Sequence, residues 1–260
     1  MTQEDPVRRF SKVFEKYRHK YEPYALFERF LEFVIVGFDQ TFSEVERPFD
    51  KEEGTACMEL FTEWTLIMNE QLKRKEWYDL LGEVYMNYLS GTMKKHWTGQ
   101  YFTPMHICDF MTKILQPGEY QRESVMDCAC GSGRILLAAH VEFPGNYCCA
   151  QDMDRVCCLM TVCNFLIHGV KGEVVWGDSL NPSDYRDGWK TNELLGIIGI
   201  PCVRKMDKME SMSFRNGLAM LSKSNVKQEE PVQKSEPTEK EKIQKKTKTR
   251  VVPIQLSLFE

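Results

Sequence analysis

The N-terminal third of the chain has apolar residues at the spacing of amphipathic helices. They recur three and four positions apart through residues 10–17 and 24–34. This spacing gives each helix one apolar face that can pack in a core. A break that contains proline, at residues 47–50, ends the first block. Two further helices are predicted at about residues 55–72 and 77–89. We therefore predict a helical N-terminal region over residues 1–95.

Beyond Pro104 the pattern changes to short apolar runs that alternate with helical segments. A helix is predicted at residues 105–115. The strands are predicted at residues 124–128, 147–150, 173–176 and 194–200, and the helices between them at residues 134–141 and 153–168. Strands that alternate with helices are typical of a parallel sheet with both faces covered. The predicted fold class is α/β, with the helical region followed by a partial Rossmann-like sheet over residues 96–205.

The composition changes again toward the C-terminal end. Residues 222–250 are mostly Lys, Glu, Gln, Ser, Thr and Pro, which offer almost nothing to bury. Such a composition is typical of a disordered segment, and we place this charged linker at residues 206–250. The last ten residues, VVPIQLSLFE at 251–260, are apolar again. An apolar end on a disordered tail suggests a docking peptide.

Charge and hydropathy narrow the classes of partner. The formal net charge is -4, so the whole protein does not attract DNA, and a basic surface would have to be local or supplied by a partner. Residues 1–9 lack the apolar stretch of a signal peptide, and no apolar run is long enough to span a bilayer. We expect a soluble, cytoplasmic protein with no membrane partner.

The ten cysteines do not form a pattern of metal ligands. No two of them have the C-x-x-C spacing of a zinc site, so no metal site is predicted. In a reducing compartment they are expected to act as small buried apolar residues.

The segment VMDCACGSGRILLAA, at residues 125–139, is the strongest candidate for chemistry. An apolar strand ends at Asp127, and a turn with Gly131 and Gly133 leads into a helix. Glycines there let the backbone approach a ligand at the carboxyl edge of a sheet. A dinucleotide fingerprint would need a third glycine where Leu136 stands, and a phosphate loop would need Gly-Lys-Ser/Thr. Both of those alternatives are therefore disfavoured.

The sequence D-x-A-C-G-S-G resembles the first motif of the amino-methyltransferases, and specifically of the adenine methylase subunits of type I restriction systems. Cys128 replaces the usual proline of that motif. Residues 99–104, Gly-Gln-Tyr-Phe-Thr-Pro, match throughout the loop that this family folds over the methionine end of S-adenosylmethionine. The resemblance covers about residues 10–202 and is dense at residues 97–180. It implies a methyltransferase sheet with S-adenosylmethionine as cofactor.

The resemblance also implies which residues hold the cofactor. An acidic residue at the end of the second strand would bind the ribose hydroxyls; Asp152 fills that place, with Asp154 as an alternative. Asp178, at the end of the third strand, would hold the adenine amine. Either Asp152 or Asp154 could instead be a helix N-cap. The implied cofactor-binding set is Gln100, Tyr101, Phe102, Thr103, Pro104, Asp127, Cys130, Gly131, Gly133, Asp152, Asp178 and Ser179.

The chain departs from this family where the chemistry would occur. The enzymes act on a flipped base and end their fourth strand in N-P-P-F/Y, whose Asn and proline carbonyl accept from the target amine. In this chain Ile200, Pro201 and Cys202 stand at the expected position, and isoleucine has no acceptor. Residues 181–184, Asn-Pro-Ser-Asp, follow Asp178 too closely for a strand and are interpreted as a turn. No catalytic residue is assigned.

The C-terminal peptide resembles a second known motif. Its sequence Gln-Leu-Ser-Leu-Phe matches the Q-L-S/D-L-F peptide by which bacterial polymerases and repair proteins bind the sliding clamp. The partner-binding residues implied are Gln255, Leu256, Leu258 and Phe259. The apolar side chains would fill a pocket on the clamp. The alternative is a terminal strand that pairs with the domain itself.

The expected function is adenine-N6 DNA methylation within a modification system, with a specificity or complementing subunit for catalysis and DNA recognition. One alternative is a catalytically inactive, cofactor-binding protein that associates with DNA, regulates a methylase and is tethered to the clamp. Another is a split enzyme whose missing strands come from a neighbouring chain, because only four of seven expected strands are identified and an unpaired sheet edge needs a cover.

Overall fold

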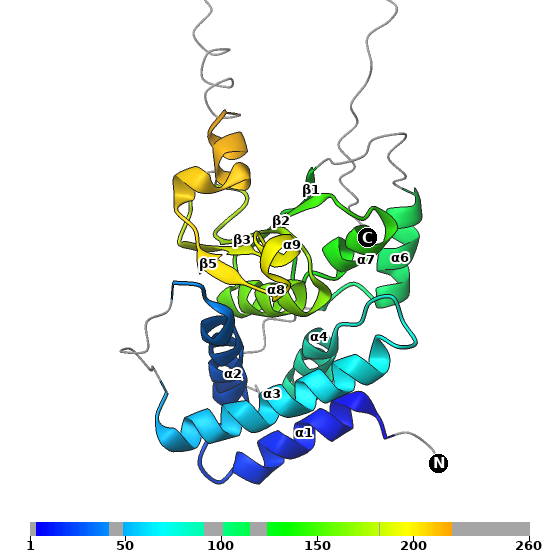
Figure 1. Cartoon of the computed structure of the whole chain (residues 1–260), viewed down its shortest axis with the longest axis vertical. Coiled ribbons are helices and arrows are strands. Elements are labelled where there is room, and N and C mark those ends of the chain that lie inside the picture. The colour runs from blue at the N-terminus through cyan, green and yellow to red at the C-terminus, as the bar shows by residue number, and fades with distance from the viewer. Residues whose placement is uncertain (1–3, 42–48, 91–100, 115–123, 182, 220–260) are drawn as a thin grey trace, which may run out of the picture. The chain divides into compact units, whose positions relative to one another are not determined.

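The computed structural model describes residues 4–41, 49–90, 101–114, 124–181 and 183–219 (Figure 1). They lie in one compact unit, Met1–Ser222. The first elements are α1 (Pro6–Tyr17), α2 (Pro23–Phe38), α3 (Lys51–Gln71), α4 (Leu80–Val84), the π-helical η1 (Tyr85–Leu89) and α6 (Met105–Ile114). The later elements are β1 (Ser124–Asp127), α7 (Arg134–Glu142), β2 (Tyr147–Asp152), α8 (Arg155–His168), β3 (Gly172–Trp176), β4 (Asp187–Thr191), α9 (Leu195–Ile198), β5 (Val203–Lys205) and the 3-10 turn η2 (Lys208–Glu210).

The helical N-terminal region is confirmed, and aromatic side chains form its core. Phe30 of α2 meets Trp64 of α3 edge to face, with ring centroids 6.0 Å apart, and Phe10 of α1 packs on the same Phe30 at 5.8 Å. All three rings are almost fully buried. Because aromatic pairs add to the burial of apolar area, this cluster fixes α1, α2 and α3 against one another.

The sheet contains a parallel half and an antiparallel half. Its order is β1-β2-β3-β4-β5, in which β1, β2 and β3 run parallel while β4 and β5 pair antiparallel. The predicted α/β class is confirmed, but the expectation of an entirely parallel sheet is wrong. Helix α8 lies between the sheet and α2 (Figure 1), and it ends at Gly169 in the left-handed region.

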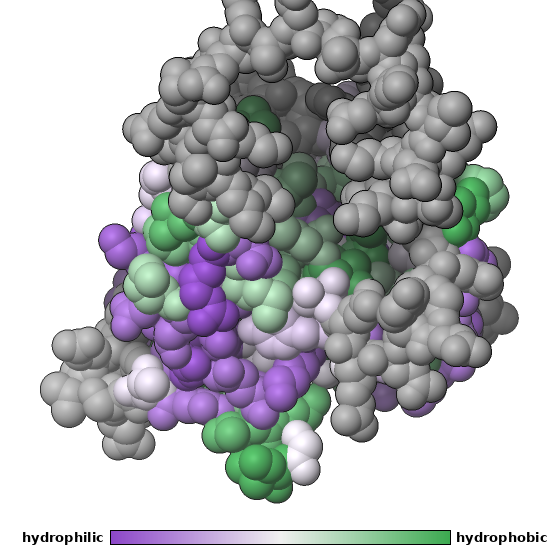
Figure 2. All heavy atoms as spheres, turned by 90° about the horizontal axis from the view of Figure 1, so that it is seen from above, coloured by the Kyte–Doolittle hydropathy of each residue, from purple (hydrophilic) through white to green (hydrophobic). Residues whose placement is uncertain are grey.

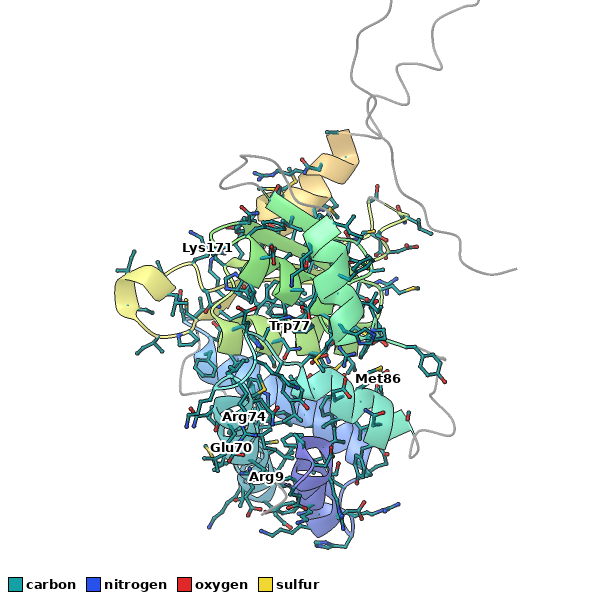
Figure 3. All side chains as sticks on the ribbon, turned by 90° about the vertical axis from the view of Figure 1, so that its right-hand side faces the viewer. Arg9, Glu70, Arg74, Trp77, Met86 and Lys171 are labelled. Carbon is teal, nitrogen blue, oxygen red and sulfur yellow. The ribbon has the colours of Figure 1, made fainter. Side chains whose placement is uncertain are left out.

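The predicted fourth strand at residues 194–200 is wrong. The fourth strand is β4, at Asp187–Thr191, and the apolar run after it forms the short helix α9, which Gly199 ends at φ 69°. No residue of α9 is buried, and Ile197 is 81% exposed. The helix projects from the body in Figure 3 (yellow), and its apolar side chains form a protruding patch at the lower edge of Figure 2. Apolar content alone therefore did not distinguish a buried strand from an exposed helix.

The beginning of the predicted linker is ordered, which corrects the boundary at residue 206. Residues 206–219 include η2 and a helix at 212–219. Glu173 of β3 is 1% exposed and anchors this segment, because its carboxylate accepts from the Ser211 hydroxyl at 2.9 Å and from the Ser213 N–H at 2.9 Å. The rest of the predicted linker and the C-terminal peptide lie outside the described residues.

The cysteines behave as expected. Nine are buried and Cys128 is exposed, and all ten are free thiols. Burial raises the pKa of the Cys148 thiol to about 12, which keeps it neutral at physiological pH. No helix within the described ranges is long and apolar enough to cross a bilayer.

We expect Glu173→Ala to lower the free energy of unfolding by about 2–4 kcal/mol, because it leaves several buried donors without an acceptor. Urea denaturation measures this change, and amide exchange at residues 211–219 should accelerate. The control is Glu76→Ala, at an exposed position, which should change stability by less than about 0.5 kcal/mol. Equal urea midpoints for Glu173→Ala and the wild type would contradict the anchor.

Candidate functional site

Three carboxylates lie at the carboxyl ends of neighbouring parallel strands. Asp127 ends β1, Asp152 ends β2, and Asp178 follows β3 by two residues. In the register of the sheet, Asp127 pairs with Ala150 and Asp152 pairs with Trp176, so the three strand ends are adjacent. Open α/β sheets bind ligands at this edge.

The glycine turn between β1 and α7 is hydrogen-bonded to the end of β2. The N–H of Gly131 donates to Asp152 Oδ2 at 2.9 Å, and the N–H of Cys130 donates to the Gln151 carbonyl at 3.0 Å. Gly131 has φ 55°, and a Cβ there would lie 2.8 Å from the Phe102 ring. Gly133 has φ 86° at the N-cap of α7. Both positions therefore require glycine, for conformation and for space.

The segment Tyr101–Pro104 lies against this turn. The Phe102 ring stacks on Tyr85 of η1, with centroids 5.5 Å apart. The guanidinium of Arg134 donates to the Thr103 carbonyl at 3.2 Å. Tyr101 is 81% exposed. Gln100, the first residue of the predicted cofactor set, lies outside the described residues.

A hollow of about 70 Å³ separates this segment from the glycine turn. Its lining includes Tyr101, Phe102, Thr103, Asp127, Cys130, Gly131, Ser132 and Arg134. Pockets for whole drug-sized ligands are larger, about 300–1,000 Å³. The hollow suits one end of an extended ligand, whose remainder would lie along the edge toward Asp152 and Asp178.

Asp152 and Asp154 have separate structural roles. Asp154 is the N-cap of α8, because its Oδ1 accepts from the Val156 N–H at 2.8 Å. Asp152 does not cap that helix; its Oδ1 accepts from the N–H of Asp154 at 2.9 Å. The capping interpretation therefore holds for Asp154.

Burial destabilises the charged form of two of the strand-end carboxylates. It raises the pKa of Asp127 above its ordinary value of 3.8, and the nearby charge of Asp152 acts in the same direction. Burial likewise raises the pKa of Asp152, while the N–H groups of Asp154 and Gly131 lower it in part. Carboxylates held at such a cost are typical of binding sites.

The third strand end forms a tight turn, as predicted for residues 181–184. Asp178 Oδ1 accepts from the Leu180 N–H at 2.9 Å, and the Asn181 carbonyl accepts from the Asp184 N–H at 2.8 Å. Ser179 is partly exposed beside it.

The predicted position of the missing catalytic tetrapeptide is wrong. Ile200 follows α9 rather than a strand and is 59% exposed. Cys202 is buried, and its N–H donates to Asn192 Oδ1 at 3.2 Å. These residues precede β5, which lies on the far side of β3 from β1. Within the described residues no strand pairs with the second edge of β1, and the sequence contains no N-P-P-F/Y segment.

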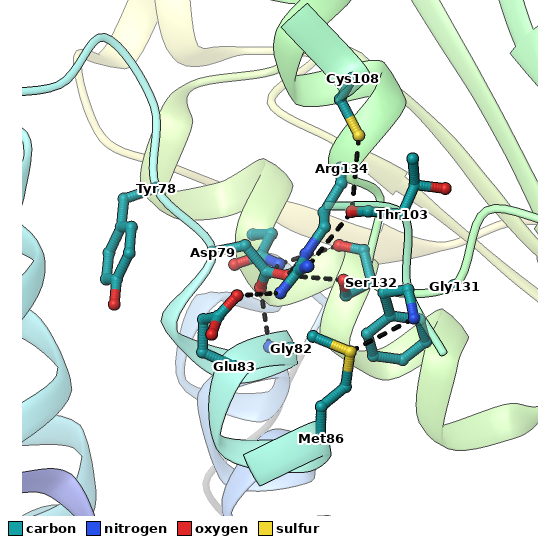
Figure 4. Close-up of polar contacts among 12 residues, drawn as sticks. Tyr78, Asp79, Gly82, Glu83, Met86, Thr103, Cys108, Gly131, Ser132 and Arg134 are labelled. Carbon is teal, nitrogen blue, oxygen red and sulfur yellow. Dashed lines mark hydrogen bonds and ion pairs between the residues drawn. The ribbon is translucent and has the colours of Figure 1, made fainter. Parts of the chain in front are cut away.

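A buried polar cluster, which the sequence did not predict, lies beside the site. Asp79, Ser132, Arg134 and Asn164 are buried and hydrogen-bonded together, and Glu83 adds a second carboxylate (Figure 4). The local sequence indicates only that Asp79 can cap α4. Its other partners are 53–85 positions away, beyond any local signal.

The parallel strand ends, the glycine turn and the strand-end acids are features of an α/β domain of the Rossmann-like type. Residues 76–198 match the family described as N-6 DNA methylase. This segment is a little under half of the chain, and over it the chain is similar to the N-6 DNA methylases.

Two relatives illustrate the similarity. The type I restriction enzyme MjaVII methylase subunit of Methanocaldococcus jannaschii is 28% identical over 140 residues, which cover 50% of this chain and 24% of the relative. The chain thus spans about a quarter of that relative. The crystal structure of a type I restriction-modification methyltransferase subunit from Streptococcus thermophilus is 20% identical; the match covers 68% of this chain and 39% of that one, with a TM-score of 0.36.

We expect Asp127→Asn to raise the melting temperature at pH 7 by a few degrees, because it removes a partly buried charge but keeps an oxygen that can accept from the Ala129 N–H. The folded pKa of Asp127 lies above 3.8, so the wild type is penalised only above that pH. The advantage of the variant should therefore be absent well below pH 3.8, grow as the pH rises from 3.8 to the folded pKa, and stay constant above it. Thermal unfolding at several pH values measures it. An advantage that does not vary with pH would refute this account.

Proposed function

We propose that this chain binds S-adenosylmethionine along the carboxyl ends of β1, β2 and β3. The observation that supports this best is the hydrogen bond from the Gly131 N–H to Asp152, which joins the glycine turn and the acidic strand end in one unit. A carboxylate fixed in this way keeps lone pairs for two neighbouring hydroxyls. The positive φ at Gly131 and Gly133 brings backbone, rather than side chain, to the ligand.

Each part of the site has a distinct proposed role. Asp152 accepts from the ribose hydroxyls and Asp178 from the adenine amine. The segment Tyr101–Pro104 covers the methionine end, above the hollow that Gly131 lines. The bound cofactor would supply an electrophilic methyl group. The residues of this chain hold that group in place and exclude water from it.

We further propose that the methyl group goes to adenine N6 of DNA in a modification system, and that a partner completes the reaction. Ile200 cannot accept a hydrogen bond from the target amine, and it does not lie beside β1. The net charge of -4 gives the chain little attraction for DNA. A specificity or complementing subunit would supply DNA recognition and the missing acceptors.

A second candidate is a cofactor-binding protein that associates with DNA and does not transfer methyl groups. It is favoured by the unpaired edge of β1 in the described part of the chain, together with the absence of N-P-P-F/Y from the sequence. In this reading the chain regulates a complete methylase, and its C-terminal peptide tethers it to the sliding clamp.

Asp152→Ala should weaken S-adenosylmethionine binding by about ten- to a hundredfold, because it removes an acceptor of ribose hydroxyls and frees the Gly131 N–H. Calorimetric titration measures this. Asp154→Ala is the matched control: it removes the cap of α8, lowers stability by about 1 kcal/mol and leaves the affinity unchanged. The proposal fails if the wild type does not bind, or if the control loses as much affinity as Asp152→Ala.

A methyl-transfer assay separates the two candidate functions. Radiolabelled cofactor is incubated with DNA and the chain, with and without co-expressed specificity and complementing subunits. Transfer to DNA in the presence of the partner subunits supports the partner-dependent methylase. Binding without transfer under both conditions supports the regulatory protein.

The tail is tested separately. A double variant, Leu258→Ala with Phe259→Ala, should lower the affinity for purified sliding clamp by at least about a hundredfold, because both apolar anchors are removed. Surface plasmon resonance with the full-length chain measures this. The control is Lys248→Ala, outside the peptide. Equal affinity of the double variant and the wild type, or no binding by either, would count against a docking peptide.

A further inference from the structure

Asp79 is a fully buried carboxylate with all its accepting positions filled (Figure 4). Its Oδ1 accepts from the Gly82 N–H and from the Asn164 amide, both at 2.8 Å. Its Oδ2 accepts from the Ser132 hydroxyl and from Arg134 Nε, both at 2.6 Å. The first of these donors belongs to α4; the others come from the glycine turn, α7 and α8. One carboxylate therefore joins the N-terminal helices to the cofactor-binding half.

Arg134 links Asp79 to the segment Tyr101–Pro104, because its guanidinium donates to both. Its side chain is 3% exposed, and its three nitrogens have three different partners: Nε bonds Asp79, Nη2 bonds Glu83 at 2.8 Å, and Nη1 bonds the Thr103 carbonyl at 3.2 Å. The guanidinium also lies 5.8 Å from the centre of the Phe102 ring. A planar fork of fixed donors can hold three acceptors at set positions, which a lysine cannot do.

The helix η1 holds the same segment from its other side. Tyr85 stacks on Phe102, and the sulfur of Met86 accepts from the Phe102 N–H at 3.3 Å. This helix is π-helical, an uncommon geometry found often at functional sites. The segment is thus held by α4 and η1 through both its backbone and its ring.

Asp79 itself does not line the hollow, whereas Ser132, Arg134 and Thr103 do. A buried ion pair adds little net stability compared with apolar packing, but it fixes the geometry of its partners. We propose that Asp79 is a positioning residue: through Arg134 and Ser132 it holds the segment Tyr101–Pro104 against the glycine turn and so sets the shape of the hollow. The consequence for cofactor affinity rests on the function proposed above.

The position of the segment can be measured without any ligand. Chymotrypsin cuts after aromatic residues, and mass spectrometry identifies cuts after Tyr101 or Phe102. Asp79→Asn keeps the size of the side chain but turns an amide toward the donors of Ser132 or Arg134. The rate of these two cuts should rise about tenfold or more, while cuts elsewhere keep their wild-type rate.

Two further variants and a control complete the test and keep it decisive if Asp79→Asn unfolds the protein. Arg134→Lys keeps one charged bond to Asp79 but loses the bond to Thr103, so the same cuts should accelerate at a temperature where circular dichroism shows the variant to be folded. Glu83→Gln should have a smaller effect in the same direction. Glu70→Gln weakens an ion pair with Arg9 in the N-terminal helices and should leave these cuts unchanged (Figure 3).

The proposal is overturned if folded Arg134→Lys is cut after Tyr101 and Phe102 at the wild-type rate. Calorimetry adds a second readout: Asp79→Asn that is folded should bind S-adenosylmethionine about tenfold more weakly than Glu70→Gln does. If the wild type does not bind the cofactor, the proposed function fails, and the proteolysis result still decides whether Asp79 positions the segment.

Discussion

A buried carboxylate must receive hydrogen bonds in place of water, and Asp79 meets this requirement with donors from three elements and a turn. Any displacement of α4 from α7 or α8 would leave a buried charge without partners, which costs several kcal/mol. The N-terminal helices and the sheet therefore cannot move independently. The site inherits this rigidity, because the glycine turn and the segment Tyr101–Pro104 contact the same cluster.

The strand-end acids, in contrast to the Asp79 cluster, lower the stability of the fold. Asp127 and Asp152 are held where burial disfavours their charge, and the N–H groups that offset this cost come from the backbone around the glycine turn. Such an arrangement gives up stability for a fixed set of acceptors. The rigid packing of the surrounding fold keeps these carboxylates in place despite their cost in stability. The N-terminal helices in this sense support the candidate site, although they contribute no residue to the predicted cofactor set.

The parts of the fold with a local signal could be predicted from the sequence. Helical periodicity identified the N-terminal region, and the strand-turn-helix pattern placed Asp127, Gly131 and Gly133 correctly. The apolar run at residues 194–200 was predicted to be a strand, but it includes α9, whose residues are not buried. The fourth strand is instead β4, a short segment of mixed polarity in which Trp189 is buried. The linker was predicted to begin at residue 206, yet the carboxylate of Glu173 accepts hydrogen bonds from Ser211 and Ser213 and holds residues 206–219 on the domain. The Asp79 cluster was beyond prediction, since its partners meet only in the tertiary structure.

The end of α2 touches the last strand of the sheet. Asp39 forms a parallel bridge with Val203, and the N–H of Gln40 donates to the Val203 carbonyl at 3.0 Å. These contacts join positions more than 160 residues apart along the chain. During synthesis the N-terminal helices emerge long before β5. The contacts of Asp39 and Gln40 with Val203 can therefore form only after most of the domain has been made. Contacts of such high sequence separation form slowly, and until they form the surfaces that they cover stay exposed to solvent.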